Sequence, residues 1–264
     1  MAKPGNRYSL LIQKVFFDRY DGDLMPVVWQ REDLVSAASE LSMPLPKNLG
    51  NVIYSIRYRN PMPDSIVATQ PKGREWVISG LGRAQYQFRL VSNTNILPRS
   101  DLISIKIPDS TPEIINSNAL GDEQALLAKV RYNRLVDLFT GVVAYSLQNH
   151  LRTTVNDIGQ IEIDEVYTGI DKRGRQFVIP VQAKGGTDKL GFIQTEQDIL
   201  CCKEKFPNLI CRSISAQFMP GNVIAMFELT VEGDELKVIE EKHYKLVPSS
   251  EISSYELASY DLRS

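Results

Sequence analysis

The sequence predicts an α/β protein of mixed helices and strands, built from two modules. Three helical patterns followed by strand-like segments fill residues 1–91. From residue 121 onward, helix and strand patterns alternate, which is typical of helices packed around a mixed sheet. The charge also divides, because residues 1–91 hold 12 Lys and Arg against 8 Asp and Glu, whereas the remainder holds 18 against 24. We therefore expect two modules with different partners.

The first module is expected to begin with helices, because apolar residues recur in it at helical spacing. Two short strands should follow, joined by the turn signal Gln70-Pro71-Lys72-Gly73, and a third alternating strand should close the module. The expected helices span residues 7–20, 31–41 and 49–58, and the expected strands span residues 66–68, 76–78 and 86–91.

Three helices followed by a hairpin is the order of a winged helix-turn-helix, in which the third helix enters the major groove. Arg57 and Arg59 end the candidate recognition helix, and Lys72 and Arg74 occupy the expected hairpin tip, where phosphates would be reached. Residues 1–91 are therefore a predicted winged-helix-like module for double-stranded DNA. The alternative is a module of the same shape that binds protein and whose basic residues are only solvated.

Composition excludes several classes of protein. The chain of 264 residues has three Cys and two His, too few for a disulfide scaffold or a His-rich zinc site. Its N-terminus is polar, and no apolar run approaches the roughly 20 residues that span a bilayer. We expect a cytoplasmic protein with reduced thiols and no membrane partner.

Residues 92–120 contain Pro98, Pro108 and Pro112 and form the expected connecting segment, with one alternating run over residues 102–107. The second module, residues 121–264, should open on a helical pattern over residues 122–147 that Gly141 interrupts, as one kinked helix or two shorter ones. Its further expected elements are strands over residues 161–167 and 177–183, a helix over 194–206, apolar runs over 209–218 and 223–231, and a polar, loosely attached tail from residue 251.

The most informative stretch is a predicted hairpin over residues 160–186, with its turn centred on Arg173. That turn pairs residue 164 with residue 182, and residue 162 with residue 184, on one face of the hairpin. Opposed Cβ atoms lie roughly 4.5–5.5 Å apart, which suits oxygens of Asp164 and Gln182 converging on one Mg²⁺ ion. The alternative is a strand that leaves the core, with Glu162 and Lys184 as a surface ion pair.

An acid on one strand, followed by Gln182-Ala183-Lys184 at the end of the next, resembles the PD-(D/E)xK nuclease superfamily. The Gln form is similar to that of Mrr-type restriction nucleases and of some type II restriction endonucleases. The likeness covers roughly residues 120–220, including a helix before the hairpin and a helix and a strand after it. It implies a restriction-endonuclease-like mixed sheet flanked by helices.

Two departures from the family pattern leave the metal site incomplete. Ile163, not Pro, precedes Asp164, and the middle acid is replaced by Gln182, whose amide offers an oxygen but no charge. Glu162 on the same face, or Glu165 next to Asp164, would supply the missing charge. Glu123 and Asp137 in the preceding helical pattern are further candidates.

The resemblance implies a Mg²⁺-dependent DNA endonuclease of the type II restriction class, acting on double-stranded DNA as a homodimer. The metal would be held by Asp164, Gln182 and Glu162, with Lys184 and Glu165 completing the catalytic set. Lys189, Gln194 and Gln197 would contact DNA or only decorate the helix they precede or begin. The alternatives are a repair or modification-dependent nuclease of the same fold, and a non-catalytic winged-helix regulator with a sensor domain.

Overall fold

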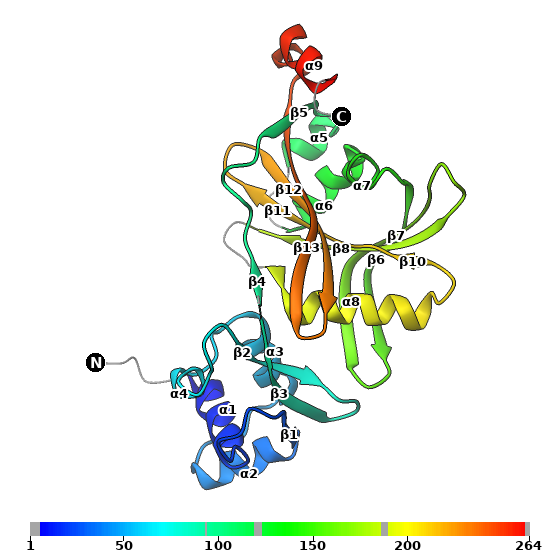
Figure 1. Cartoon of the computed structure of the whole chain (residues 1–264). Coiled ribbons are helices and arrows are strands. Elements are labelled where there is room, and N and C mark those ends of the chain that lie inside the picture. Colours follow the sequence, from blue (N-terminus) through cyan, green and yellow to red (C-terminus); the bar gives the residue numbers. More distant parts are fainter. Residues whose placement is uncertain (1–5, 93, 119–122, 186–189, 262–264) are drawn as a thin grey trace.

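A computed structural model describes residues 6–92, 94–118, 123–185 and 190–261 (Figure 1). Helices and strands are mixed throughout, so the predicted α/β class is confirmed. Residues 6–91 form an N-terminal module at one end of the molecule, and the remaining residues form a larger module around a long sheet. None of the described helices has the length and apolar character needed to cross a bilayer.

The N-terminal module contains four helices and a three-stranded antiparallel sheet in the order β1-β3-β2. Its core is aromatic, because the Phe16 ring lies 5.4 Å from that of Trp76 and 5.0 Å from that of Phe88. The elements are α1 (Arg7–Phe17), β1 (Val27–Gln30), α2 (Asp33–Glu40), α3 (Gly50–Tyr58), α4 (Asp64–Val67), β2 (Glu75–Gly80) and β3 (Gln85–Val91).

The expected strand over residues 66–68 is wrong, because Ile66 belongs to α4 and is fully buried. A short apolar run does not distinguish a buried strand from a buried helical turn. The hairpin is formed by β2 and β3 and turns at residues 81–84. Lys72 and Arg74 therefore lie in the connection from α4 to β2, not at the tip of the hairpin.

The larger module is built on an eight-stranded mixed sheet, whose main path is β5-β13-β12-β11-β8-β7-β6, with β10 beside β8. β8 pairs in parallel with β11, and β13 with β5, whereas the other strands on this path are antiparallel. Its elements are β4 (Asn95–Ile96), β5 (Ser104–Pro108), α5 (Glu113–Asn116), α6 (Glu123–Tyr132), α7 (Leu135–Thr140), β6 (Val143–Val155), β7 (Gly159–Ile170), β8 (Gln176–Lys184), β9 (Leu190–Gly191), α8 (Phe192–Lys205), β10 (Ile210–Cys211), β11 (Ser213–Met219), β12 (Val223–Glu232), β13 (Glu235–Val247), a 3-10 turn (Ser249–Glu251) and α9 (Ser254–Asp261).

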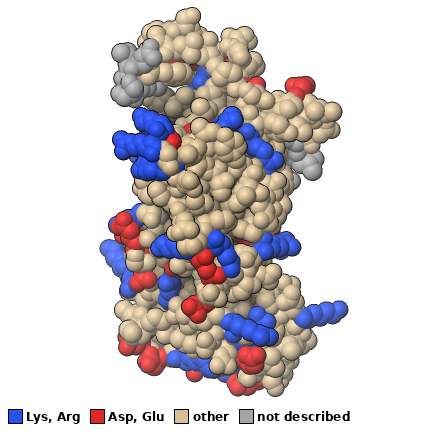
Figure 2. Space-filling view, turned by 90° about the vertical axis from the view of Figure 1, so that its right-hand side faces the viewer, with Lys and Arg blue, Asp and Glu red and all other residues tan. Residues whose placement is uncertain are grey.

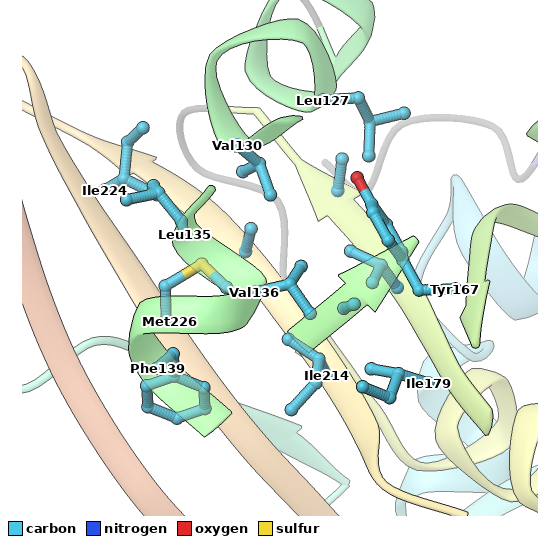
Figure 3. Packing of buried hydrophobic residues seen from close by; sticks show 14 of the residues in the cluster. Leu127, Val130, Leu135, Val136, Phe139, Tyr167, Ile179, Ile214, Ile224 and Met226 are labelled. Carbon is cyan, nitrogen blue, oxygen red and sulfur yellow. The ribbon is translucent and has the colours of Figure 1, made fainter. Parts of the chain in front are cut away.

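Helices cover both faces of this sheet, and alternate residues of β8 show it. Ile179 and Val181 pack in the cluster that holds α6 and α7, which Figure 3 shows around Leu135 and Phe139. Val178 packs in the cluster that holds Cys201 of α8. Successive strand residues point to opposite faces, so α6 and α7 lie on one face and α8 on the other.

The helical pattern expected over residues 122–147, as one kinked helix or two shorter ones, forms two short helices, α6 and α7, and is wrong beyond Thr140. Arg134 adopts a left-handed φ of 50° between α6 and α7, and Gly141, with a φ of 67°, ends α7. Residues 143–155 continue as the edge strand β6, where Tyr145 and Leu147 are exposed. Their spacing fitted a helix by coincidence, because an exposed edge strand needs no regular apolar alternation.

The segment over residues 92–120 does more than connect the modules. The strand expected over residues 102–107 exists as β5 and extends the large sheet beside β13, while β4 pairs with β9. The modules also share a hydrophobic cluster that contains Val91 and Phe192. Gly80 comes so close to the β6–β7 turn that a Cβ there would lie 2.1 Å from the carbonyl oxygen of Ile158. The α9 helix, in the expected loose tail, is anchored by an ion pair between Lys106 and Glu256.

Candidate active site

The β7–β8 hairpin has the register that the sequence predicts from Glu165 to Val181, but the predicted pairs of residue 164 with 182 and of residue 162 with 184 are wrong, because the ladder ends before them. Glu165 pairs with Val181 and Ile170 with Gln176, which centres the turn on residue 173. Asp171 stabilises that turn by accepting hydrogen bonds from the backbone N–H groups of Arg173 and Arg175. The sequence signal was sufficient here because turn chemistry and strand alternation agree.

Asp164 lies where β7 begins to part from β8. The ladder between the two strands ends at Glu165 and Val181, and from Val181 onward β8 pairs on its other side with β11. The Asp164 Oδ2 atom accepts a hydrogen bond of 2.9 Å from the backbone N–H of Ala183. The carboxylate thus takes the place of a strand partner and sits at the fork between the two strands.

Gln182 is buried, with 3 % of its surface exposed, and its amide is held by α8. Its Nε2 donates to both carboxylate oxygens of Asp198, at 3.1 and 3.0 Å, and lies 3.4 Å from the carbonyl oxygen of Glu162. Its Oε1 accepts a hydrogen bond of 2.9 Å from Gln194 Nε2. An amide oxygen has two lone pairs, so one remains for a further partner.

Asp198 is the residue that sequence reasoning missed. It is 1 % exposed, and its burial raises the pKa of this carboxyl well above the usual value, with the nearby charge of Asp164 acting in the same direction. Gln182 is its hydrogen-bond partner among the described residues, and no basic nitrogen of those residues lies within 4 Å of it. The available signal was a polar residue on the inward stripe of the predicted helix.

The Asp164 carboxyl also has a raised pKa, because it is largely removed from water. The hydrogen bond from Ala183 and the positive charge of Lys184 oppose that rise. Lys184 Nζ lies 3.7 Å from Glu123 Oε1 of α6, and 14 % of the Lys184 side chain is exposed. Asp164, in the first half of β7, therefore lies beside Gln182 and Lys184 at the end of β8, and Glu123 of α6 lies beside Lys184.

Glu162 stands at the exposed rim of this group. Its carboxylate lies 3.1 Å from Arg152 Nε and 3.5 Å from His150 Nδ1, both on β6. The negative charge of Glu162 raises the pKa of Asp164, and His150 lowers it. The residues at the rim therefore influence the ionisation of Asp164. Asp137 is elsewhere: it pairs with Arg134 and accepts a hydrogen bond from the Ala144 backbone.

Glu165 is not brought to Asp164, although the two are adjacent in the chain. It projects to the α6 face, fully buried, where its Oε1 accepts hydrogen bonds from Arg131 at 3.0 Å and Ser146 at 2.6 Å. Its Oε2 and the Tyr167 hydroxyl are buried without a hydrogen-bond partner in the part of the chain that the structure describes. Figure 3 shows the Tyr167 hydroxyl directed toward the end of the cluster where Leu127 lies. The burial of Glu165 on the α6 face separates it from the predicted catalytic set.

The predicted DNA contacts of α3 differ in access. Arg57 donates from Nε to the carbonyl oxygen of Ile78 at 2.8 Å, and burial lowers the pKa of its guanidinium. Arg59 is exposed, and its guanidinium lies 5.0 Å from the centre of the Tyr54 ring. Only Arg59 of this pair is presented to a partner outside the chain.

The remaining predicted contacts divide in the same way. Lys72 is exposed, whereas Arg74 donates to the carbonyl oxygen of Leu90 at 2.7 Å and pairs with Asp234 of the larger module at 3.1 Å. Gln194 donates a hydrogen bond to Gln182 and so contacts the candidate site. Lys189 lies outside the described residues. Over the N-terminal module, basic and acidic residues intermingle on the face seen in the lower part of Figure 2.

Oxygen donors of the described residues near the fork include the carboxylates of Asp164, Glu162 and Asp198 and the amide of Gln182. Among the residues described, no group of three or more His, Cys, Asp and Glu side chains is arranged to hold a metal ion. A carboxylate and an amide oxygen are nonetheless the donor types that Mg²⁺ takes, usually with several of its waters retained. The residues present therefore fit a hard cation held by few protein ligands.

Comparison with known proteins gives no family assignment for this chain. No protein-family model matches it, and a search of curated proteins finds no match.

Proposed function

We propose that this protein is a Mg²⁺-dependent DNA endonuclease of the type II restriction class, which cuts double-stranded DNA as a homodimer in the cytoplasm. The observation that carries the proposal is the meeting of Asp164, Gln182 and Lys184 at the fork of β7 and β8, backed by the buried acid Asp198. Titratable groups with pKa values shifted by burial, gathered at one place, are typical of functional sites. Free thiols at the three cysteines support a reducing compartment.

The order of elements supports the resemblance to PD-(D/E)xK nucleases. Helices α6 and α7 precede three antiparallel strands, β6, β7 and β8, and α8 then leads through β10 to β11, which runs parallel to β8. Gln182 and Lys184 lie on β8 and Asp164 lies on β7, as that resemblance requires. The second motif is thus on a central strand of the sheet, next to the helix that follows it.

The residues divide the chemical work of phosphodiester hydrolysis. Asp164, Gln182 and Glu162 would hold the metal, which would polarise the phosphate and lower the pKa of a bound water. Lys184 would place its positive charge beside the phosphoryl oxygens, where negative charge grows in the transition state. Ala183 holds Asp164 in place through its backbone N–H. Asp198 and Gln194 hold the Gln182 amide in one orientation.

The N-terminal module would bind the DNA. Its order α1-β1-α2-α3-β2-β3, with one short helix before β2, supports a winged-helix arrangement with α3 as the reading helix. Arg59 and Lys72 are the exposed cations of the predicted contact set. Arg57 and Arg74, which the sequence also favoured, are already engaged within the protein.

Cleavage of varied plasmid DNA tests the proposal. Wild-type protein with Mg²⁺ should give discrete bands, and EDTA should abolish them. Asp164→Ala and Lys184→Ala should each lower cleavage by about 100-fold or more, because each removes charge that acts in the transition state. Asp137→Ala is the matched control, since Asp137 is a part-buried acid outside the site. Metal-independent cutting, or variants as active as wild type, would contradict the proposal.

A regulator without catalytic activity is the second candidate, and one observation favours it. Both ends of the Gln182 amide already have hydrogen-bond partners within the protein, and Lys184 is already within 4 Å of Glu123, as in a purely structural cluster. A regulator would bind one DNA sequence tightly and cut none, with or without Mg²⁺. Cleavage confined to damaged or modified plasmid would instead indicate a repair or modification-dependent nuclease of the same fold.

A further inference from the structure

One turn of α8 carries two sets of contacts that point in different directions. Gln194 and Asp198, four residues apart on one side of the helix, hold the amide of Gln182. Glu196 and Gln197, between them in sequence, face the N-terminal module. The turn of α8 that hydrogen-bonds to Gln182, the candidate metal ligand, is therefore also the turn that contacts the N-terminal module.

The contacts from the N-terminal module come from α3 and β3. The hydroxyl of Tyr58, the last residue of α3, donates to Gln197 Oε1 at 3.2 Å. Arg89 of β3 forms an ion pair with Glu196, and each side chain is 19 % exposed. The Arg89 guanidinium also lies 5.1 Å from the centre of the Phe192 ring, at the start of α8. Both polar contacts thus end on residues one and two positions before Asp198 in the chain.

These polar contacts are not the only ones between the modules in the part of the chain that the structure describes. A shared apolar cluster, with Val91 and Val77 on one side and Phe192 and Ile193 on the other, already joins them. Apolar packing holds α8 against the sheet and the N-terminal module. Hydrogen bonds are directional and weaken steeply when misaligned, so the contacts at Glu196 and Gln197 add a directional restraint on this one turn of α8.

We propose that the N-terminal module positions the candidate site through α8, with Tyr58 and Gln197 as the positioning pair. A small shift of α8 would move Gln194 and Asp198 together and would release the Gln182 amide from its present orientation. Since α3 is the proposed reading helix, DNA bound there would act on the same pair. This inference rests on the proposed function for its role in cleavage, whereas the link from Tyr58 to Gln182 is a property of the protein alone.

Tyr58→Phe tests the link in the full chain, because it removes only the hydroxyl that reaches Gln197. Tyr54→Phe is the matched control, since Tyr54 lies one helical turn earlier on α3 and is half exposed. The first readout is the side-chain amide resonance of Gln182 in ¹⁵N-labelled protein, without metal or DNA. We expect Tyr58→Phe to shift that resonance and Tyr54→Phe to leave it unchanged.

The second readout is the separation of kcat from KM for plasmid cleavage. Tyr58→Phe should lower kcat about three- to tenfold, the effect of one lost hydrogen bond, with KM changed less than about twofold. Gln197→Ala should act in the same way, and the double variant should be no worse than either single variant. Additive losses would mean that the two side chains act separately, and would overturn the inference.

The outcomes separate this inference from the proposed function. An unchanged Gln182 resonance in Tyr58→Phe would overturn the link, whether or not the protein cuts DNA. Active wild type with Tyr58→Phe at the wild-type kcat would overturn the positioning role and leave the nuclease intact. Wild type that cuts no DNA, together with a shifted Gln182 resonance, would refute the nuclease and retain the link.

Discussion

Asp164 and Glu165 are neighbours in the chain, yet they lie on opposite faces of the sheet in unlike surroundings. Glu165, on the α6 face, is neutralised by Arg131 and hydrogen-bonded to Ser146. Asp164 and Asp198, on the α8 face, have no basic nitrogen of the described residues within 4 Å, and burial raises the pKa of both carboxyls. An acid locked to an arginine is structural, whereas acids kept without a cation lower stability and are candidates for function.

Glu165→Gln is expected to give the largest change in stability. It removes the negative charge that Arg131 pairs with and replaces one of the two buried carboxylate oxygens by an amide NH2 group. We expect a loss of about 2 kcal/mol in the free energy of unfolding, moderated because Arg131 is 38 % exposed. Urea unfolding measures it. Cleavage per folded molecule should stay near wild type, and a specific loss of activity would place Glu165 in the site after all.

Asp198→Asn is expected to give a smaller change of opposite sign. Above the unfolded-state pKa, the folded protein holds a proton on Asp198 that the unfolded chain has released, so wild-type stability falls as pH rises toward the folded-state pKa. Asparagine keeps the shape, carries no charge at either pH and still accepts one of the two hydrogen bonds from Gln182, through its Oδ1. Unfolding at pH 5 and pH 8 should show the variant more stable at pH 8, by about 1 kcal/mol, with less difference at pH 5.

Measuring DNA cleavage by Asp198→Asn distinguishes a functional role of Asp198 from a structural one. If Asp198 serves the site, Asp198→Asn should gain stability and lose cleavage together, which is typical of a residue kept for function at a cost in stability. A variant that is less stable than wild type at pH 8 would instead assign Asp198 the structural role that Glu165 has.

Arg152→Gln should give the smallest effect. The pair between Arg152 and Glu162 lies at the exposed rim, with side chains 68 % and 42 % exposed. Exposed pairs contribute little, so the free energy of unfolding should change by less than about 0.5 kcal/mol. Thermal unfolding at low and high salt would measure it. A larger loss in the free energy of unfolding that salt does not change would show that the pair between Arg152 and Glu162 behaves as a buried ion pair.

Much of the local structure was predictable from the residues themselves. Helices α1, α2, α3 and α8, strands β7 and β8, and the pairing of Glu165 with Val181 follow from apolar spacing and turn chemistry. Alternation alone also separates Asp164 from Glu165, because successive strand residues face opposite sides. It does not reveal which side holds the cation, since Arg131 reaches Glu165 from a different element.

The sequence by itself determined the mixed α/β class, the hairpin register and the grouping of Asp164, Gln182 and Lys184, because these depend on contacts between neighbouring segments. Only the tertiary structure decided that Asp198 closes over Gln182, that Arg57 and Arg74 are used inside the protein, and that Tyr58 reaches Gln197. Those contacts join residues that are 16 to 160 positions apart. The packing of α8 between the sheet and the N-terminal module sets several of them, and no local pattern encodes that packing.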